Sequence, residues 1–232
     1  MSGDSNSSSI PKINAVIFDL DGTLVDNMDF HVQAFSTFTE RHGLPDLTAV
    51  MRKRIDGKRN RDIFPILFDD PLDPGAIQAH TMEKESLYRN LSEGNLEPLD
   101  GLVEFLQFLE KNHTPFGIAT SAPDANVIHS LEGLGLTEEF AVIVRGDQVP
   151  RGKPHPDVFL ETAKLLDIPP AECLVFEDAP AGIEAALAAG MRCAAMTTSF
   201  DAETIMENVK PHYFLSSYIE VLNKPGRFGL LH

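Results

Sequence analysis

Short apolar segments recur along the chain in the way expected of buried strands. The first of them, residues 13–18, is apolar apart from Asn14, is rich in Ile and Val, and runs straight into Asp19. Strands that are buried on both faces have such nearly continuous apolar stretches. Similar segments follow at 115–119, 141–144, 173–176 and 192–196. The sequence therefore predicts a buried strand at each of these five places.

Helical patterns lie between most of these segments. Leu102, Phe105, Leu106 and Leu109 have the i, i+3, i+4, i+7 spacing of one helix face. Further helices are expected near 157–167 and over the alanine-rich stretch 181–189, which is stopped by Gly190. Because buried strands alternate with helices, the pattern predicts an α/β fold whose sheet is mostly parallel and covered on both faces.

The interval 27–94 breaks this alternation. It contains helical material around Phe30, Ala34, Phe35 and Phe38 and again at 76–91, with Pro or Gly at 71, 74 and 75, but no convincing strand. We interpret it as a helical insertion after the first strand. The predicted organisation is a tail at 1–10, a core made of 11–26 and 95–232, and a cap domain at 27–94.

The composition is that of an ordinary globular protein. Of 232 residues, 43% are hydrophobic and 23% are charged, which argues against a collagenous or largely disordered chain. No apolar run reaches the roughly 20 residues of a membrane span. Residues 1–10 lack the basic start and the apolar stretch of a secretory signal. We expect a flexible tail there, core thiols at Cys173 and Cys193, and a reducing, cytoplasmic location.

The net charge is strongly negative. With 19 Lys and Arg against 35 Asp and Glu, the formal charge is -16. A field of that sign repels nucleic acid and anionic membranes, and no obligate protein partner is implied. One basic cluster is the exception, formed by Arg52, Lys53, Arg54, Lys58, Arg59 and Arg61. It suits an anionic substrate, although a solvated face is an equal alternative for its first three members.

Asp19 and Asp21 directly follow the first predicted strand, in the sequence Asp-Leu-Asp-Gly-Thr. Two carboxylates at i and i+2, followed by Gly22 that lets the chain turn, can converge on one small volume. One could then attack a substrate while the other handles protons. Such a like-charge pair is unfavourable without a cation, so the motif predicts a hard metal ion, Mg²⁺. The alternative is a solvated turn.

Other polar residues follow later strands. Glu177 and Asp178 come after 173–176 and precede a helix, so they suit either Mg²⁺ ligation or a helix cap. Thr120 and Ser121 end the strand at 115–119 and could hold a phosphate or cap a helix. Because parallel strands place their carboxyl ends at one edge, where open α/β sheets bind ligands, these residues should form one site.

Lys153 lies in the irregular stretch Gly-Lys-Pro-His-Pro-Asp. A lone loop lysine is usually solvated, but one between a glycine and two prolines is more readily held in place. Its cation could then neutralise carboxylates and a phosphate together. The sequence therefore adds a positive charge to the predicted site.

With these motifs in order, the sequence resembles the haloacid dehalogenase-like superfamily of aspartate-nucleophile phosphotransferases. Its four motifs are similar to FDLDGTLVD, IATSA, GKPHPDVF and FEDAPAGIEAALAAG, which cover the core from about 13 to 198. The helical insertion resembles the subgroup that contains β-phosphoglucomutase and many small-metabolite phosphatases. The resemblance implies a Rossmann-like core with an inserted α-helical cap, and it is far less specific for the substrate.

Roles for the core residues follow from the resemblance. It makes Asp19 the nucleophile that forms an aspartyl-phosphate, and Asp21 the general acid/base that also gives Mg²⁺ its backbone carbonyl. Thr120 would bind the phosphate and Lys153 would stabilise its charge. Glu177 and Asp178 would be the remaining metal anchors. These roles agree with the chemistry of covalent phosphoryl transfer.

The cap would carry the specificity. Gly57 to Asp62 resemble the G-x-x-x-x-D specificity loop, and His31 and Lys84 stand where mutase-like members have a His and a Lys. The arginine that β-phosphoglucomutase uses for a second phosphate aligns with Asn60, between Arg59 and Arg61. Substrate-binding residues are thus expected at His31, Gly57, Arg59, Asn60, Arg61, Lys84 and, from the core, Ser121.

The sequence as a whole predicts a Mg²⁺-dependent phosphatase of a small phosphorylated metabolite, a sugar or polyol phosphate. A hexose-phosphate mutase using the same residues is the nearest alternative, and it differs in whether water or a sugar hydroxyl accepts the phosphoryl group. A non-catalytic, phosphate-responsive binding protein is an alternative of another class. An intact set of nucleophile, acid/base and metal residues argues against it.

Overall fold

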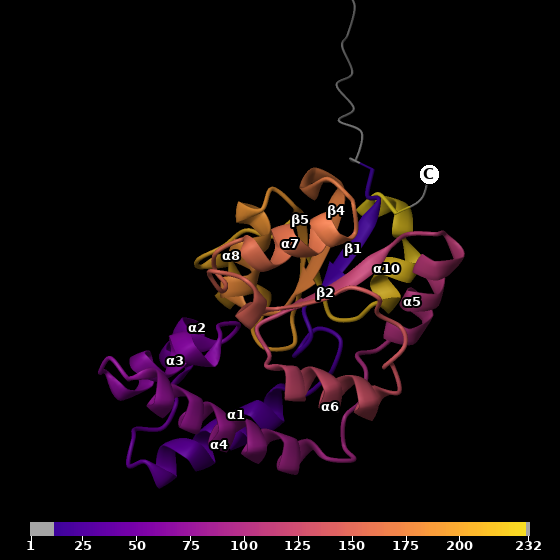
Figure 1. Ribbon diagram of the computed structural model, residues 1–232. Helices are drawn as coiled ribbons and strands as arrows, with labels where there is room; N and C mark the ends of the chain where they lie inside the picture. The colour runs from indigo at the N-terminus through magenta and orange to yellow at the C-terminus, as the bar shows by residue number, and fades with distance from the viewer. Residues whose placement is uncertain (1–11, 231–232) are drawn as a thin grey trace, which may run out of the picture.

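The computed structural model of the chain describes residues 12–230 and contains, within them, a parallel sheet of six strands (Figure 1). The strand order is β3-β2-β1-β4-β5-β6. The strands are β1 (Ala15–Phe18), β2 (Phe116–Thr120), β3 (Ile143–Arg145), β4 (Cys173–Glu177), β5 (Arg192–Met196) and β6 (Tyr213–Leu215). The tail predicted at 1–10 lies outside the described residues.

All five strands predicted from the sequence are present, which confirms the α/β class. The sequence analysis missed β6, which pairs with β5 at the edge of the sheet. With three residues, one of them only half-buried, β6 is too short to produce a recognisable apolar run.

Helices cover both faces of the sheet because side chains alternate along each strand. Val16 and Phe18 of β1 belong to one hydrophobic cluster, whereas Ala15 and Ile17 belong to another. The first cluster includes residues of α5 (Leu102–Lys111), α6 (Asp124–Leu134) and α10 (Ile219–Asn223). The second includes residues of α7 (Asp157–Leu165), α8 (Pro180–Ala188) and α9 (Ala202–Met206). Short 3₁₀ turns lie at η1 (Gly146–Gln148), η2 (Pro170–Glu172) and η3 (Pro225–Phe228).

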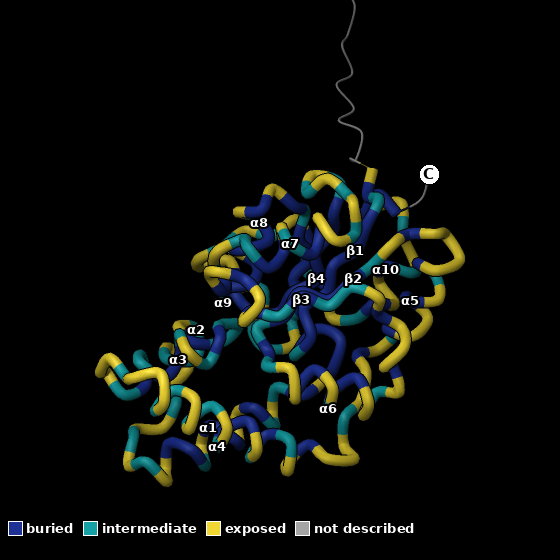
Figure 2. Tube along the Cα trace, in the orientation of Figure 1, coloured by how far each residue is buried: buried dark blue, intermediate teal, exposed yellow. Residues whose placement is uncertain are grey.

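The interval 27–94 contains helices joined by turns and loops, has no strand, and lies beside the carboxyl ends of the strands (Figure 1). Its helices are α1 (Met28–Arg41), α2 (Ala49–Ile55), α3 (Asn60–Phe68) and α4 (Pro74–Ser92). The first three share a hydrophobic cluster of their own, against which Leu87 of α4 packs; it is formed by Phe35, Phe38, Ile55, Ile63, Phe64 and Leu67. Figure 2 shows buried, intermediate and exposed stretches along these helices, whereas most strand residues are buried. The four helices form a structural group, and their role as a cap stays a prediction.

The start of α4 differs from the sequence prediction of 76–91. Pro74 and Gly75 were expected to precede the helix, yet both belong to it. Proline is well tolerated in the first turn of a helix, where its missing N–H needs no partner. The side chain of Asp73 caps the helix by accepting hydrogen bonds from the N–H groups of Gly75 and Ala76. None of the helices in residues 12–230 combines the length and apolarity needed to cross a membrane.

Candidate active site

Three acidic side chains meet at the carboxyl end of the sheet. Asp19 follows β1, Glu177 ends β4, and Asp178 comes next. Because β1 and β4 are adjacent and Phe18 pairs with Phe176, these residues lie at the same level of the sheet. One carboxylate oxygen from each lies within 4.8 Å of the other two, and all three side chains are buried. The structure thus brings the two acidic motifs together.

Lys153 inserts its ammonium group between these acids. Its Nζ lies 2.6 Å from Asp19 Oδ1 and 2.8 Å from Glu177 Oε1, and the side chain is 2% exposed. The ammonium also lies 5.0 Å from the centre of the Phe159 ring on α7. The Lys153–Pro154 peptide bond is cis. The solvated-loop alternative for this lysine is therefore wrong.

The charges in this cluster do not balance, because one ammonium faces three carboxylates. Burial raises the pKa of Asp19 to about 7, although Lys153 partly opposes the shift. Burial and the neighbouring carboxylates of Glu177 and Asp19 also raise the pKa of Asp178. Burial disfavours the Lys153 ammonium, yet Asp19 and Glu177 raise its pKa overall. Negative charge is in excess here, and a cation would relieve it.

The donor set of this cluster fits a divalent metal ion. All the available ligand atoms of Asp19, Glu177 and Asp178 are carboxylate oxygens, which hard cations prefer. Glycine is needed at position 22 because a Cβ there would overlap the Asp178 carboxylate. The φ of Gly22 is +70°, in the left-handed region that glycine adopts without strain. Ser199 donates a hydrogen bond to Asp178 Oδ2. The cluster could therefore hold a divalent cation.

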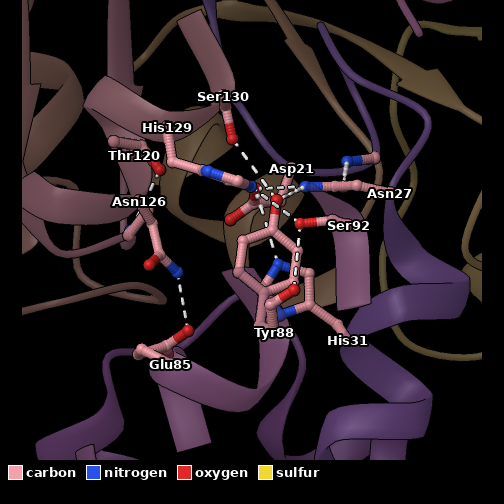
Figure 3. A network of polar contacts seen from close by, with 12 residues as sticks. Asp21, Asn27, His31, Glu85, Tyr88, Ser92, Thr120, Asn126, His129 and Ser130 are labelled. Carbon is pink, nitrogen blue, oxygen red and sulfur yellow. Dashed lines mark hydrogen bonds and ion pairs between the residues drawn. The ribbon is translucent and has the colours of Figure 1, made fainter. Parts of the chain in front are cut away.

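Asp21 has different surroundings from Asp19. Its Oδ1 accepts a hydrogen bond of 2.7 Å from Asn27 and lies 3.6 Å from His31 Nε2 (Figure 3). Burial acts to raise the pKa of Asp21, but His31 and Asn27 outweigh it and lower the pKa. Asn27 also donates to the hydroxyl of Tyr88 on α4. Asp21 is thus held as a carboxylate by residues of the helical group.

A cavity of about 600 Å³, counting its open mouth, lies between the sheet edge and the helical group. Its floor includes Asp19, Asp21, Asp178 and the strand-end residue Thr120. On the other side it is lined by residues from the helical group and α6. These are Met28, His31, Phe35, Ile55, Asp56, Gly57, Lys58, Asn60, Ile63, Glu85 and Asn126. The cavity could hold a small molecule with one end against Asp19.

Comparison with known proteins agrees with this geometry. Residues 16–196 match the sequence profile of a family described as haloacid dehalogenase-like hydrolase. The match spans all the residues of the buried cluster. The chain belongs to the haloacid dehalogenase-like hydrolase family.

Similar proteins of the family include both phosphatases and a mutase. The phosphorylated carbohydrates phosphatase of Thermotoga maritima is 33% identical over 222 residues, covering 90% of this chain and 100% of that protein. The β-phosphoglucomutase of Bacillus subtilis is 34% identical over 187 residues, covering 77% of this chain and 81% of that protein. A family IA hydrolase structure from Entamoeba histolytica has a TM-score of 0.82 at 26% identity, covering 94% of this chain and 99% of the other. The protein is therefore a hydrolytic enzyme.

Thr120 and Ser121 of this hydrolase face the same cavity. The Thr120 hydroxyl accepts a hydrogen bond from the N–H of Ala122, and so it closes the turn after β2. The Ser121 hydroxyl donates to the carbonyl of Gly57 at 2.7 Å. Ser121 thus joins the core to the loop before α3.

The substrate-binding residues predicted in the helical group lie in different places. Asn60 lines the cavity and donates to Glu85 at 2.6 Å. Lys84 does not line it; its ammonium is buried between His31 Nδ1 and Glu85 Oε1, at 3.0 and 2.9 Å. An ammonium only donates, so Nδ1 of His31 is the acceptor in this contact, and Nε2 faces Asp21.

Arg59 and Arg61 lie outside the cavity lining. Arg59 is 8% exposed and donates to the carbonyls of Gly146 and Val149, at 3.0 and 3.3 Å, and to Asp62. Its guanidinium is thereby occupied in joining the helical group to the loop after β3. Arg61 is exposed. A direct contact of either arginine with substrate stays a prediction that this arrangement does not support.

The sequence analysis missed three polar residues of the cavity, Asp56, Glu85 and Asn126. Asn126 donates from Nδ2 to Glu85 Oε2 at 2.6 Å (Figure 3), and both residues line the cavity. Glu85 follows Lys84 on a helix whose other buried positions include Tyr88, so its place on that face could have been found from the helical spacing. Asn126 lies on α6, a helix that the sequence analysis had not predicted.

Proposed function

We propose that this hydrolase is a Mg²⁺-dependent phosphatase that acts on a small phosphorylated metabolite, a sugar or polyol phosphate, through an aspartyl-phosphate on Asp19. The observation that carries the proposal is the position of Asp19. Its carboxylate is buried at the floor of an open cavity, 2.6 Å from the Lys153 ammonium. A fixed carboxylate beside a cation suits covalent phosphoryl transfer.

Two steps complete the reaction. In the first, Asp19 attacks phosphorus, the bond between phosphorus and the leaving oxygen breaks, and that oxygen takes a proton from Asp21. In the second, Asp21 takes a proton from water, whose oxygen attacks phosphorus and releases phosphate and free Asp19. Lys153 and Thr120 stabilise the phosphoryl oxygens in both steps. Each group ends the cycle as it began.

The protonation of Asp21 has to change during this cycle. Without substrate, Asn27 and His31 lower its pKa, which favours the proton-accepting form needed in the second step. A phosphate dianion arriving beside Asp21 raises the pKa of its carboxyl, because like charges disfavour ionisation. Substrate binding thereby promotes the proton-donating form that the first step needs.

Mg²⁺, when bound, offsets the negative charge of the transferring phosphoryl group. The groups that would hold it are Asp19, the backbone carbonyl of Asp21, Glu177 and Asp178. Both oxygens of Glu177 already accept hydrogen bonds, from Lys153 and from the N–H of Ala179. We therefore expect Asp178 to contribute more to metal affinity than Glu177 does.

Glu85 favours a substrate with an uncharged far end. It lines the cavity, is 4% exposed, and accepts hydrogen bonds from Asn60 and Asn126. Burial acts against its charge, but Lys84 outweighs burial and lowers the pKa of Glu85. A second phosphate placed here would face this carboxylate, whereas sugar hydroxyls could donate to it. A sugar or polyol monophosphate suits the cavity better than a bisphosphate.

A hexose-phosphate mutase is the second candidate, because the similar Bacillus protein is named β-phosphoglucomutase. A mutase passes through a sugar bisphosphate, so its cavity must accept a second phosphate opposite Asp19. On the helical side of the lining, Lys58 is cationic, but Asp56 and Glu85 are acidic and Asn60 is neutral, so negative charge outweighs the single ammonium. This difference favours water over a sugar hydroxyl as the phosphoryl acceptor.

Turnover of a panel of phosphorylated metabolites with Mg²⁺ tests the proposal. The panel includes hexitol phosphates, fructose 1-phosphate and β-glucose 1-phosphate with a bisphosphate primer. We expect phosphate release from monophosphates, and more of it than isomerisation of β-glucose 1-phosphate. Isomerisation in excess of phosphate release would establish the mutase. Binding of phosphate without turnover of any compound would support a phosphate-responsive binding protein instead.

The cellular setting stays a prediction from composition. We propose that the enzyme works in a reducing, cytoplasmic compartment and has no obligate protein partner. Its net charge of -16 argues against binding to nucleic acid or anionic membranes. Both cysteines, Cys173 and Cys193, are free and buried. Fractionation of cells that produce the protein would test its location.

A further inference from the structure

His42, His80 and Glu83 form a second cluster of metal-binding side chains within residues 12–230. One ligand atom from each lies within 4.8 Å of the other two. His80 and Glu83 are about one turn apart on α4, and His42 is the C-cap of α1. These two helices pack side by side (Figure 1). His42 lies eleven residues after His31, roughly 16 Å along the helix, so the cluster is separate from the active site.

Aromatic packing fixes both imidazole rings. The His80 ring stacks on Phe68, with centroids 4.7 Å apart and an interplanar angle of 20°. The His42 ring lies 4.3 Å from the centroid of Phe38. The two imidazoles are 4.9 Å apart and nearly perpendicular. Rings held in this way lose little conformational freedom when they bind a ligand, and an apolar shell is usual around metal sites.

The carboxylate of Glu83 is oriented from two sides. Its Oε2 lies 2.8 Å from His42 Nε2, and its Oε1 accepts from Arg41 at 3.3 Å. Arg41 and His42 both belong to the end of α1, so these contacts hold the Glu83 carboxylate against that helix.

We propose that His42, His80 and Glu83 form a binding site for a divalent transition-metal ion of the Zn²⁺ class, which joins α1 to α4. Two imidazole nitrogens and one carboxylate oxygen are a typical Zn²⁺ donor set, with water in the fourth position. Tetrahedral Zn²⁺ ligands are about 3.4 Å apart at usual bond lengths, so small side-chain rotations complete the site. Mg²⁺ prefers oxygen ligands and is not expected here.

The site has a consequence for the helices that line the active-site cavity. The helix α1 carries His31, and α4 carries Lys84 and Glu85. An ion that binds only the folded pair stabilises it by mass action. Zn²⁺ should therefore raise the melting temperature of the protein by a few degrees, without entering the catalytic carboxylate cluster.

Calorimetric titration of the full, tag-free chain with ZnCl₂ tests the proposal. Saturating Mg²⁺ is kept present so that the active-site carboxylates are occupied. The variants are His80→Gln and Glu83→Gln, which each remove one ligand atom. His113→Gln is the matched control, because His113 is exposed in the turn after α5. Asp178→Ala controls for binding at the active site.

Co²⁺ replaces Zn²⁺ in a parallel visible absorption spectrum, since tetrahedral Co²⁺ absorbs far more strongly than octahedral Co²⁺.

We expect one equivalent of Zn²⁺ to bind at micromolar or lower concentration, with a rise in melting temperature and intense Co²⁺ bands. Affinity should fall by at least about tenfold in His80→Gln and Glu83→Gln and stay unchanged in His113→Gln and Asp178→Ala. Absence of Zn²⁺ binding to the unmodified protein would overturn the proposal. Equal binding by the ligand variants and the control would do the same, and loss of binding only in Asp178→Ala would assign the ion to the active site. If His80→Gln does not fold, Glu83→Gln alone decides.

Discussion

Asp19 and Asp21 are two residues apart and yet have opposite electrostatic surroundings. Burial beside Glu177 raises the pKa of Asp19, whereas His31 and Asn27 lower the pKa of Asp21. Neighbouring carboxyl groups whose pKa values are moved apart commonly take different chemical roles. The two carboxyl groups are therefore not equivalent: Asp19 needs a cation beside it to act as an ionised nucleophile, whereas the neighbours of Asp21 already favour its ionised form.

The role of Asp21 predicts a dependence on the leaving group. Asp21→Asn keeps the hydrogen-bonding shape but cannot transfer a proton, so turnover of sugar phosphates should fall by about 10²–10⁴. The phenolate of an aryl phosphate can leave without taking a proton. The phosphoryl-transfer step from aryl phosphates should therefore slow much less. Pre-steady-state rates of alcohol or phenol release measure this step. Equal losses for both substrates would contradict proton donation by Asp21.

The raised pKa of Asp19 predicts how stability depends on pH in the absence of metal. Between about pH 4 and 7 the folded state keeps a proton on Asp19 that the unfolded state has lost. Stability should therefore fall as pH rises through this window, by up to about 1.4 kcal/mol per pH unit from this group. Asp19→Asn has no carboxyl group to titrate, so its stability should not show this part of the decrease with pH.

Denaturant unfolding in EDTA at several pH values measures the effect. From pH 4 to 7, the stability of the variant should increase relative to that of the unmodified enzyme. At pH 8, added Mg²⁺ should stabilise the unmodified enzyme more than it stabilises the variant. Parallel stability curves for the two proteins would show that Asp19 is ionised without a metal.

Among the elements, α8 fixes the position of Glu177. Gly182 lies in the first turn of α8, and a Cβ at this position would overlap Glu177 Oε1. We predict that Gly182→Ala displaces Glu177 from Lys153 and lowers kcat by about 10²–10³, the scale of losing a fixed charge beside the phosphoryl group.

Gly75→Ala in the first turn of α4 is the matched control. Its Cβ would approach only the capping Asp73 carboxylate, at 3.1 Å. Steady-state kinetics and melting temperatures of both variants make the comparison. An active Gly182→Ala enzyme would mean that Glu177 need not contact Lys153.

Substitutions at Arg59 and Asn60 should distinguish a structural role from a role in substrate recognition. Arg59 satisfies two buried carbonyls of the core, and leaving them unpaired costs about 1–3 kcal/mol. Arg59→Ala should therefore lower kcat/KM for sugar and aryl phosphates alike. Asn60→Ala removes a side chain of the cavity and should affect sugar phosphates alone, by about tenfold. The opposite pattern would make Arg59 the substrate-binding residue.

At the scale of the whole molecule, the sheet and the core motifs could be predicted because local patterns determine them. A buried strand such as Ala15–Phe18 needs a continuous apolar run, and an acid directly after it must lie at the sheet edge. The far side of the cavity could not be predicted, because it depends on how α4 packs beside α6. Glu85 and Asn126 are 41 residues apart, and only this packing joins them.

Dependence on tertiary packing also explains why the partners of Arg59 were not predicted. Its position in a basic stretch suggested contact with an anionic substrate, and the sequence contains no sign of the carbonyls of Gly146 and Val149 that it reaches. Long side chains have several partners within reach, and tertiary packing selects among them. The chemistry of the core was therefore more predictable than the specificity of the helical group.

The most direct test of the account is to identify the residue that carries the phosphoryl group. The enzyme is mixed with a turned-over monophosphate and Mg²⁺, quenched in acid within the first turnover, and treated with borohydride, which reduces an aspartyl-phosphate to homoserine. Peptide mass spectrometry then locates the homoserine. The account predicts it at position 19, and its absence from Asp19→Asn. Homoserine at another aspartate, or none in an enzyme that releases phosphate, would contradict Asp19 as the nucleophile.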